Sequence, residues 1–224
     1  MIARRRIHAV VPVKNPAFGK SRLAPVLDAR ERRALCQFLA TRTLDICVSA
    51  FGASRTIVVT SAPDVARYAT HAGAQLVPEG AGADDLNAAI ALGIERARLD
   101  GADAVLVVPA DLALLNVSEL RVAAEAIPEA PGCLIVPDRR DTGTNLLGLA
   151  PLNAGLLSFG ELSRFRHADL ATLAGYEVRF HRSTALALDL DIPEDYADWR
   201  QSLAMTEEEA DPVALPAPVD ARGR

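Results

Sequence analysis

Short runs of valine, isoleucine and leucine recur along the chain, and the stretches between them have helical spacing. Four runs are continuous in apolar residues and bounded by turn residues, at 7–13, 56–60, 104–109 and 133–137. Such runs are typical of strands buried on both faces of a sheet. The alternation therefore predicts β-α-β-α order, a mostly parallel sheet and one three-layer α/β domain of Rossmann-like type.

Helix start and stop signals agree with this order. Asp28 and Glu31 have the spacing of a capping box ahead of a helix that ends near Gly52. Pro63 lies in the first turn of a second helix that ends near Gly73. The remaining helices are predicted to start at Asp84 or Asp85, at Asn116 or Ser118, and at Pro193, the last ending near residue 203.

The regular alternation weakens after residue 137. A polar loop over 138–143, a run over 145–150 and an irregular stretch to 167 predict the antiparallel part of the sheet and the insertions that face the substrate. Two strand-like runs come next, at 177–181 and 186–191. The composition then changes to glutamate, proline and alanine, so we predict a domain over 1–203 and a disordered tail over 204–224.

Composition and cysteine count narrow the class of protein. The chain has 224 residues and a net charge of −5, enough length to bury a full core without disulfides or metal. Its three cysteines include no C-x-x-C pair, which argues against a disulfide framework or a structural zinc site. We find neither a signal peptide nor an apolar run of the ~18 residues that a membrane span needs. We therefore expect a cytoplasmic protein that binds no membrane.

The basic residues are concentrated at the start of the chain. Residues 1–33 contain nine basic and two acidic side chains, although the whole chain is acidic. With only 4% aromatic residues, this distribution favours a local anion site over an extended nucleic-acid surface. For Arg30, Arg32 and Arg33, a solvated helix face is an equally good interpretation.

Asp189 and Asp191 form the strongest local pattern, in the sequence Leu-Asp-Leu-Asp-Ile-Pro. In a strand, residues two apart face the same way, so both carboxylates can reach one cation. Asp191 also fits an ordinary helix cap, because Pro193 lies just after it. Asp189 is flanked by leucines, and burying its charge is costly without a cation or donors.

A third carboxylate, Asp111, comes directly after the apolar run over 105–110. It is therefore expected at the carboxyl end of a central strand, where open α/β sheets bind their ligands. A helix cap or turn aspartate is the alternative. Carboxylates combined with a basic loop in one crevice indicate metal-assisted chemistry on phosphate.

The basic loop comes after the first predicted strand, from Pro12 and Val13 to residue 23. It supplies Gly19 for backbone access and three cations for a triphosphate, which are Lys14, Lys20 and Arg22. The loop lacks the first glycine of a Walker P-loop. Other chemistry has little support: the four histidines are dispersed, and the chain has neither G-x-S-x-G nor G-x-G-x-x-G after its first strand.

Six motifs in this order resemble one known family. They read V-P-V-K-x(5)-K-S-R-L-A-P, L-N-A-A, V-P-A-D-L, G-T-N, F-G-x-x-S-x-x-x-H and D-L-D-I-P-E-D. Together they span about residues 7 to 200 and resemble the guanylyltransferases that activate a small phosphorylated carboxylic acid with GTP in the biosynthesis of coenzyme F(420). The family commonly has glycine before L-N-A-A, where this chain has Asp85.

The resemblance implies a fold similar to that of the molybdenum-cofactor guanylyltransferases, with a specific reaction and site. The family joins GTP to 2-phospholactate, phosphoenolpyruvate or 3-phosphoglycerate and releases diphosphate, and its product goes to a transferase with a deazaflavin acceptor. By the family pattern, Asp111, Asp189 and Asp191 hold Mg²⁺. The residues implied to contact GTP are Pro12, Val13, Lys14, Lys20 and Arg22, with Glu79 and Asn87 as candidates for the base or ribose. The residues implied for the phosphoacid are Thr144, Gly160 and Ser163.

Two other functions remain open on the sequence. A sugar nucleotidyltransferase or glycosyltransferase of similar fold would use Asp189 and Asp191 as a D-x-D metal motif. A non-catalytic nucleotide-binding module would use its aspartates only as caps. The basic loop around Lys20 favours cleavage of a nucleoside triphosphate, and a homodimer is compatible with the sequence.

Overall fold

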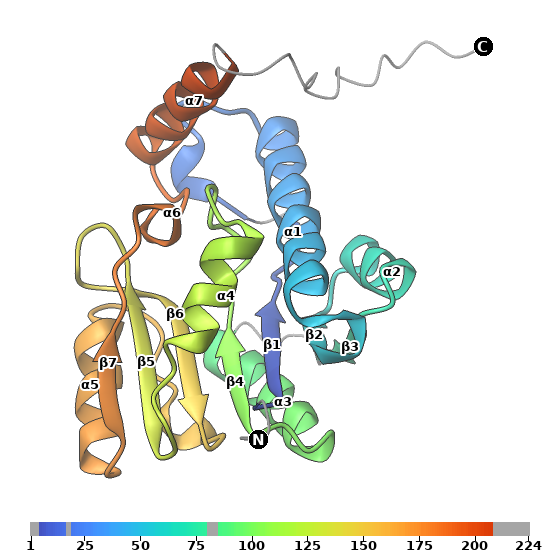
Figure 1. The fold of residues 1–224 in the computed structure, drawn as a ribbon. Helices are drawn as coiled ribbons and strands as arrows, with labels where there is room; N and C mark the ends of the chain where they lie inside the picture. Colours follow the sequence, from blue (N-terminus) through green and yellow to red (C-terminus); the bar gives the residue numbers. More distant parts are fainter. Residues whose placement is uncertain (1–4, 17–18, 80–84, 208–224) are drawn as a thin grey trace.

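Seven strands form one mixed sheet, in the order β3-β2-β1-β4-β6-β5-β7 (Figure 1). The computed structural model of the protein describes residues 5–16, 19–79 and 85–207. The strands are β1 (Ile7–Pro12), β2 (Thr56–Thr60), β3 (Gln75–Pro78), β4 (Ala104–Val107), β5 (Gly132–Pro137), β6 (Thr144–Ala150) and β7 (Glu177–Phe180). Among the strand pairs of the described residues, only those that β6 makes with β4 and β5 are antiparallel. The prediction of a mostly parallel α/β sheet with an antiparallel part beyond residue 137 is confirmed.

The helices begin where the sequence supplies caps. Asp28 and Glu31 form the predicted capping box, while Asp85 and Asn116 each accept a backbone N–H in the first turn of their helix. The α-helices are α1 (Ala29–Phe51), α2 (Pro63–His71), α3 (Leu86–Leu99), α4 (Val117–Glu125), α5 (Ser163–Leu173), α6 (Thr184–Ala187) and α7 (Pro193–Glu207). Short 3₁₀ turns lie at η2 (Ser21–Leu23), η3 (Ala53–Arg55) and η4 (Ala154–Leu156). Asp84, the other candidate cap, lies outside the described residues.

The helices cover both faces of the sheet. Apolar side chains of α1, α2, α4 and α6 pack on one face and those of α3 and α5 on the other. Alternate residues of β1 point to opposite faces of the sheet: Val11 packs on the side of α1, α2, α4 and α6, and Val10 packs on the side of α3 and α5. The sequence of this strand is therefore apolar without interruption, as expected for a strand in the middle of a three-layer fold.

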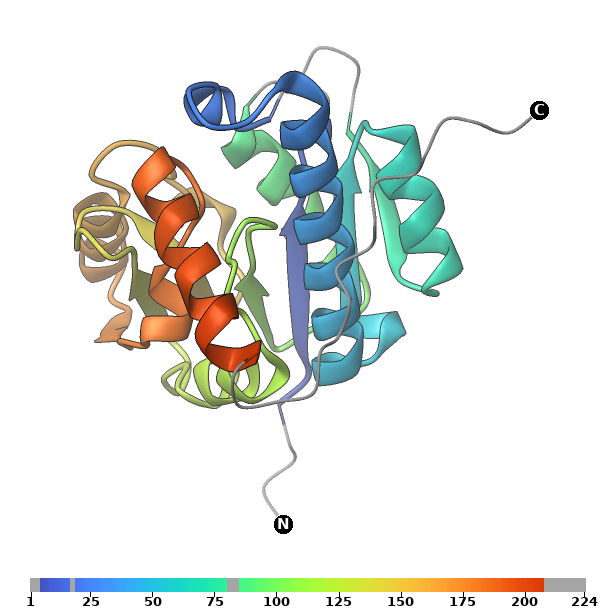
Figure 2. The same ribbon diagram turned by 90° about the horizontal axis from the view of Figure 1, so that it is seen from above.

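A third apolar cluster lies outside the sheet, at its carboxyl edge. Here α7 packs across η2 and the first turns of α1, with Leu23, Leu39, Leu190 and Trp199 among the buried residues. Seen from above, α1 and α7 both reach this edge (Figure 2). The cluster therefore ties the loop after β1 to the segment between α6 and α7.

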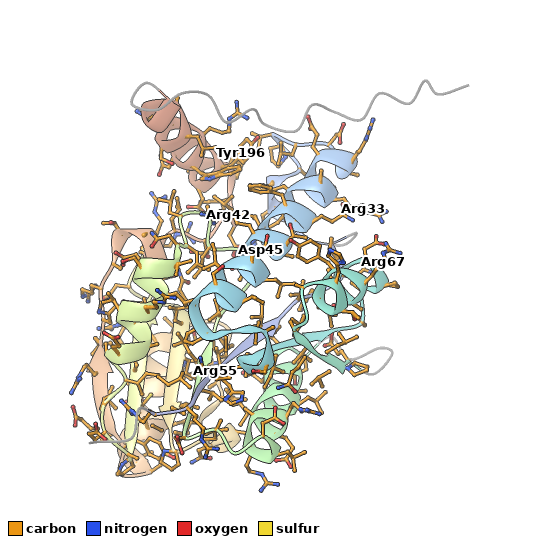
Figure 3. The ribbon with its side chains drawn as sticks, turned by 45° about the vertical axis from the view of Figure 1, so that its right-hand side comes forward. Arg33, Arg42, Asp45, Arg55, Arg67 and Tyr196 are labelled. Carbon is orange, nitrogen blue, oxygen red and sulfur yellow. The ribbon has the colours of Figure 1, made fainter. Side chains whose placement is uncertain are left out.

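Helix α1 is long and apolar enough to cross a membrane by length and composition alone. Its apolar side is occupied in the fold, because Leu44, Cys47 and Phe51 are buried against the sheet and α4. On its outer side Asp45 accepts the Tyr68 hydroxyl of α2, and Arg33 pairs with Asp64 (Figure 3). The composition of α1 is thus that of a core helix.

Several sequence predictions differ from the structure. The strand predicted at 186–191 is wrong, because 184–187 form α6 and only Asp189 makes an isolated bridge, to Leu112. The edge strand β3 and helix α5 were not predicted: β3 is short and only partly buried, and α5 begins inside the stretch expected to be irregular. Helix α7 continues to Glu207, past the predicted end near 203, and residues 208–224 lie outside the described part.

Candidate active site at the carboxyl edge of the sheet

The loops after β1 and β4 meet over the carboxyl edge of the sheet and enclose a cavity of about 430 Å³. Because β1 and β4 are parallel neighbours, their C-terminal loops lie at the same edge. Seven of the residues predicted for the site line this cavity: Pro12, Val13, Lys14, Lys20, Arg22, Asp111 and Asp191. The basic loop and two of the three predicted metal carboxylates therefore come together as the sequence indicated.

Lys20 is the centre of this arrangement. Its Nζ donates to Asp111 Oδ2 at 2.8 Å and to Asp191 Oδ1 at 2.7 Å. The lysine side chain is 11% exposed, whereas those of Asp111 and Asp191 are 31% and 40% exposed. One ammonium group thus bridges two carboxylates that are far apart in the sequence.

The charges in this group shift one another's pKa values. Burial alone would lower the pKa of Lys20, but Asp111 and Asp191 outweigh it and raise the pKa, so the ammonium stays charged. Burial tends to raise the pKa of Asp191, yet Lys20, with Arg22 and Arg140 at longer range, lowers it overall. Lys20 adopts left-handed backbone angles (φ 56°, ψ 39°), which are uncommon for a residue other than glycine.

Asp189 lies beside this pair, close enough for the charges of Asp111 and Asp191 to act on it. Residues 188–190 run next to 111–113, where Leu190 N–H donates to Asp111 O and Ala113 N–H donates to Leu188 O. Burial raises the pKa of Asp189 to about 6, and the negative charges of Asp111 and Asp191 add to the effect. Three carboxylates therefore share one edge with a single lysine between two of them.

The sequence also allowed Asp191 to cap the last helix, but in the structure Asp195 holds the start of α7. The carboxylate of Asp195 accepts the N–H groups of Asp191 and Ile192 at the start of α7, and Arg139 pairs with its other oxygen. Asp195 is only 2% exposed. The Asp191 carboxylate instead faces Lys20, and the start of α7 is held by Asp195, a residue that the sequence pattern did not single out. The position of Asp195, two residues after Pro193 and therefore in the first turn of a helix, was the sequence signal for this role.

The loop after β1 is held to the rest of the edge by close contacts. Thr60, at the end of β2, donates its hydroxyl to Val13 O at 2.7 Å. A Cβ placed on Gly19 would lie 2.7 Å from Cys36 Sγ, so the loop backbone approaches α1 more closely than a side chain permits. Burial raises the pKa of the Cys36 thiol. The cation-bearing segment thus has a defined path over α1.

A second group of predicted residues lies beside the cavity and not in its lining. Asn87 donates its amide to Phe159 O at 3.2 Å and accepts Phe159 N–H at 2.7 Å. Thr144 N–H donates to Ser163 Oγ, and the Thr144 hydroxyl contacts His167 Nδ1 at 2.9 Å. The predicted site residues that do not line the cavity are Glu79, Asn87, Thr144, Gly160, Ser163 and Asp189.

His167 was not predicted as part of the site, although it closes the F-G-x-x-S-x-x-x-H motif. It is fully buried, its Nε2 accepts Ser158 N–H, and burial lowers its pKa to about 4. It is therefore neutral, and its Nδ1–H faces the Thr144 hydroxyl. Its spacing of four from Ser163 places both on one side of α5, which was the missed signal.

A larger cavity, about 580 Å³, lies at the opposite edge of the sheet, and its lining includes Arg5, Arg55 and Arg121. Arg5 donates to the carbonyls of Ile127 and Pro128, and Arg121 donates to Ser49 O. These carbonyls lie at or just beyond helix C-termini, where cations are favourable. Arg55 lies at this end of α1, far from Arg33 (Figure 3). Arg5 and Arg121 therefore bind carbonyls near helix ends, whereas the 430 Å³ cavity combines cations with the predicted metal carboxylates.

Sequence comparison finds a family model and named relatives that match most of the chain. The family model "Guanylyl transferase CofC like" matches residues 7–200. A phosphoenolpyruvate guanylyltransferase of Rubrobacter xylanophilus is 40% identical over 85% of this chain and 92% of its own length. A 3-phospho-D-glycerate guanylyltransferase of Colwellia psychrerythraea is 30% identical over 85% and 89%.

Solved structures show the same fold at low sequence identity. A nucleotidyl transferase from Methanothermobacter thermautotroptrophicus is 18% identical, with a TM-score of 0.63 over 91% of this chain and all of the other. The relatives found by sequence have higher identity to this chain than these structures have, and the matches extend over nearly the whole domain. The chain belongs to the guanylyl transferase CofC-like family and is a nucleotidyltransferase.

Proposed function

We propose that the protein transfers GMP from GTP to the phosphate of a small phosphorylated carboxylic acid and releases diphosphate. The observation that carries this proposal is the bridge from Lys20 to Asp111 and Asp191, inside a cavity lined by the basic loop. Cations that line a cavity suit a triphosphate, and clustered carboxylates suit the metal that accompanies it. Both are needed where two anions must approach each other.

The donor set fits Mg²⁺, which prefers carboxylate oxygens and phosphate. Among the described residues, no three acidic, histidine or cysteine side chains are already arranged as a metal site, and Lys20 Nζ lies between Asp111 and Asp191. Burial, together with the charges of Asp111 and Asp191, raises the pKa of Asp189 to about 6, as expected where three carboxylates lie close together. We therefore propose Asp111, Asp189 and Asp191 as the residues that hold Mg²⁺, with Lys20 turning toward the phosphates.

The reaction needs charge neutralisation and alignment. An oxygen of the acceptor phosphate attacks the α-phosphorus of GTP, and the β,γ-diphosphate leaves on the opposite side. Bound Mg²⁺ would screen the charge that develops on the transferring phosphoryl group. Lys20, with Lys14 and Arg22, would bind and orient the triphosphate. An acceptor phosphate is largely ionised at neutral pH, so no general base is required.

The acceptor is proposed to bind beside Asp111. Thr144 begins β6, the strand next to β4, and its antiparallel direction places it at the carboxyl edge. Gly160 is exposed with φ 132°, so its backbone is open to a ligand. Ser163 contributes a hydroxyl next to Thr144. The names of the relatives favour phosphoenolpyruvate first and 3-phosphoglycerate second.

We further propose that the product serves the biosynthesis of coenzyme F(420) in the cytoplasm, where a transferase with a deazaflavin acceptor consumes it. The resemblance of the six motifs to that family supports this step. A guanylylated diphosphate is an activated donor, so its consumer must transfer the phosphoacid part and release GMP.

The test measures diphosphate release with GTP or ATP, crossed with 2-phospholactate, phosphoenolpyruvate, 3-phosphoglycerate and a sugar phosphate. The product is trapped with the deazaflavin acceptor and its partner transferase. Release with GTP and one phosphoacid, and little with ATP, supports the proposal. Release from no pair contradicts it, and release only with a sugar phosphate indicates the sugar nucleotidyltransferase alternative.

A further inference from the structure

We infer that Asn87 is a positioning residue for the phosphoacid, and that it acts by fixing the segment around Phe159 and Gly160. This inference rests on the proposed function. It is an alternative to the expectation that Asn87 contacts the base or ribose of GTP. The chain of contacts runs from α3 through the backbone of Phe159 to His167 and Thr144.

The first step is the reciprocal pairing between Asn87 and Phe159. The Asn87 amide donates to Phe159 O at 3.2 Å, and Phe159 N–H donates to Asn87 Oδ1 at 2.7 Å. The two residues are 72 positions apart in the sequence. Asn87 itself is held in the first turn of α3, where its N–H donates to the Asp85 carboxylate. A rigid helix thus clamps both polar backbone groups of a loop residue.

The second step is the contact between this loop and His167. The Phe159 ring meets the His167 ring edge to face, with 4.7 Å between centroids. Ser158 N–H donates to His167 Nε2 at 3.0 Å, and His167 Nδ1 contacts the Thr144 hydroxyl at 2.9 Å. Residues 158 and 159 are therefore fixed from two sides, by α3 and by α5.

The third step concerns the turn between Phe159 and α5. Gly160 has φ 132° and is exposed, and a Cβ added to it would have no neighbour within 4 Å. Leu162 adopts φ 55°, and Ser163 N–H closes the turn onto Gly160 O. The clamp at Phe159 therefore fixes the position of an exposed turn that contains Gly160 and ends at Ser163. Ser163 Oγ in turn accepts a hydrogen bond from Thr144 N–H. A change at Asn87 should be felt mainly where this turn meets its ligand.

The test separates the two substrates. In Asn87→Ala, the KM for phosphoenolpyruvate should rise about tenfold, because the two hydrogen bonds that hold the backbone of Phe159 are lost. The dissociation constant of GTP, measured by calorimetry, should stay within about twofold. His167→Asn removes the other side of the clamp and should raise the same KM. Asn116→Ala removes an asparagine cap at α4 and should leave both constants unchanged.

Two results would overturn the inference. One is a weakened GTP affinity in Asn87→Ala with an unchanged KM for the phosphoacid, which assigns Asn87 to the nucleotide. The other is unchanged constants in both clamp variants while thermal unfolding shows that they are folded. If the wild-type protein releases no diphosphate with any pair, the proposed function fails. Calorimetric binding of phosphoenolpyruvate to wild type and Asn87→Ala then decides the positioning role by itself, and a wild type that does not bind it refutes that role too.

Discussion

Two groups of side chains lie at the carboxyl edge of the sheet, and they differ in charge and in exposure. Lys20, Asp111 and Asp191 are charged and line an open cavity. Thr144 and His167 are uncharged and buried, and they join the clamp that Asn87 makes on Phe159. The first group carries charges that a substrate or metal can use. The second has its polar atoms engaged with protein.

This difference separates chemistry from positioning. Bridging charges in a partly exposed cavity can exchange partners when a polyanion binds, because water and ligand replace what the protein gives up. Buried neutral hydrogen bonds have no such replacement, and breaking them leaves unsatisfied groups. Substitutions in the charged group should therefore reduce activity with little loss of stability, and substitutions in the neutral group should affect stability and acceptor binding.

The largest expected effect is at Asp111. Asp111→Asn removes one carboxylate from the proposed metal site and one partner of Lys20, and should lower kcat for diphosphate release by about 10² to 10³-fold. The variant should unfold within a few degrees of the wild type. The matched control is Asp45→Asn, an exposed aspartate of α1 whose carboxylate accepts the Tyr68 hydroxyl on the outer side of the helix. Wild-type turnover in Asp111→Asn contradicts the assignment.

The next effect is at Lys20. In Lys20→Ala the triphosphate loses its central cation, and kcat/KM for GTP should fall about 10 to 100-fold in steady-state assays. Arg55→Ala removes a cation from the larger cavity at the other edge of the sheet and should not change this value. Equal losses in the two variants would show that general charge, and not the site, determines the response to GTP.

We expect the buried, uncharged His167 to make the stability of the protein depend on pH. His167 has an ordinary pKa of 6.5 that burial lowers to about 4, so the unfolded chain takes up a proton before the folded chain does. The stability that this histidine contributes is complete above about pH 6.5 and is lost as the pH falls toward 4, by up to about 3 kcal/mol. Urea denaturation at pH 7, 5.5 and 4.5 measures the loss. His167→Asn, which has no group that titrates there, should reduce the slope, and an unchanged slope argues against a buried neutral histidine.

The smallest effect is expected outside both groups. Asp28→Ala breaks the capping box at the start of α1 and should lower the free energy of unfolding by about 1 kcal/mol, as measured by urea denaturation. Because α1 carries Cys36 beside the basic loop, a change in KM for GTP would show that the loop depends on this cap. We expect the KM values for both substrates to stay at the wild-type level.

The sequence predicted the charged group better than the neutral one. Asp111 lies at the end of a continuous apolar strand and Lys20 lies in a basic loop, and both patterns are local. Asn87 and Phe159 meet only through tertiary structure across 72 residues, so no spacing rule reveals their pairing. The prediction of a strand at 186–191 was wrong because alternating leucine and aspartate is also compatible with an irregular segment. Here the leucines of that segment are buried, and Asp189 makes a single bridge to Leu112.

The most direct test of the proposed site is magnesium-dependent diphosphate release from GTP and phosphoenolpyruvate by the wild type and by Asp111→Asn. We predict that the wild type releases diphosphate in Mg²⁺ and loses this activity in EDTA, and that Asp111→Asn has little activity at any Mg²⁺ concentration while remaining folded. Turnover by Asp111→Asn at the wild-type rate, or wild-type turnover that EDTA does not reduce, would contradict the assignment of the site.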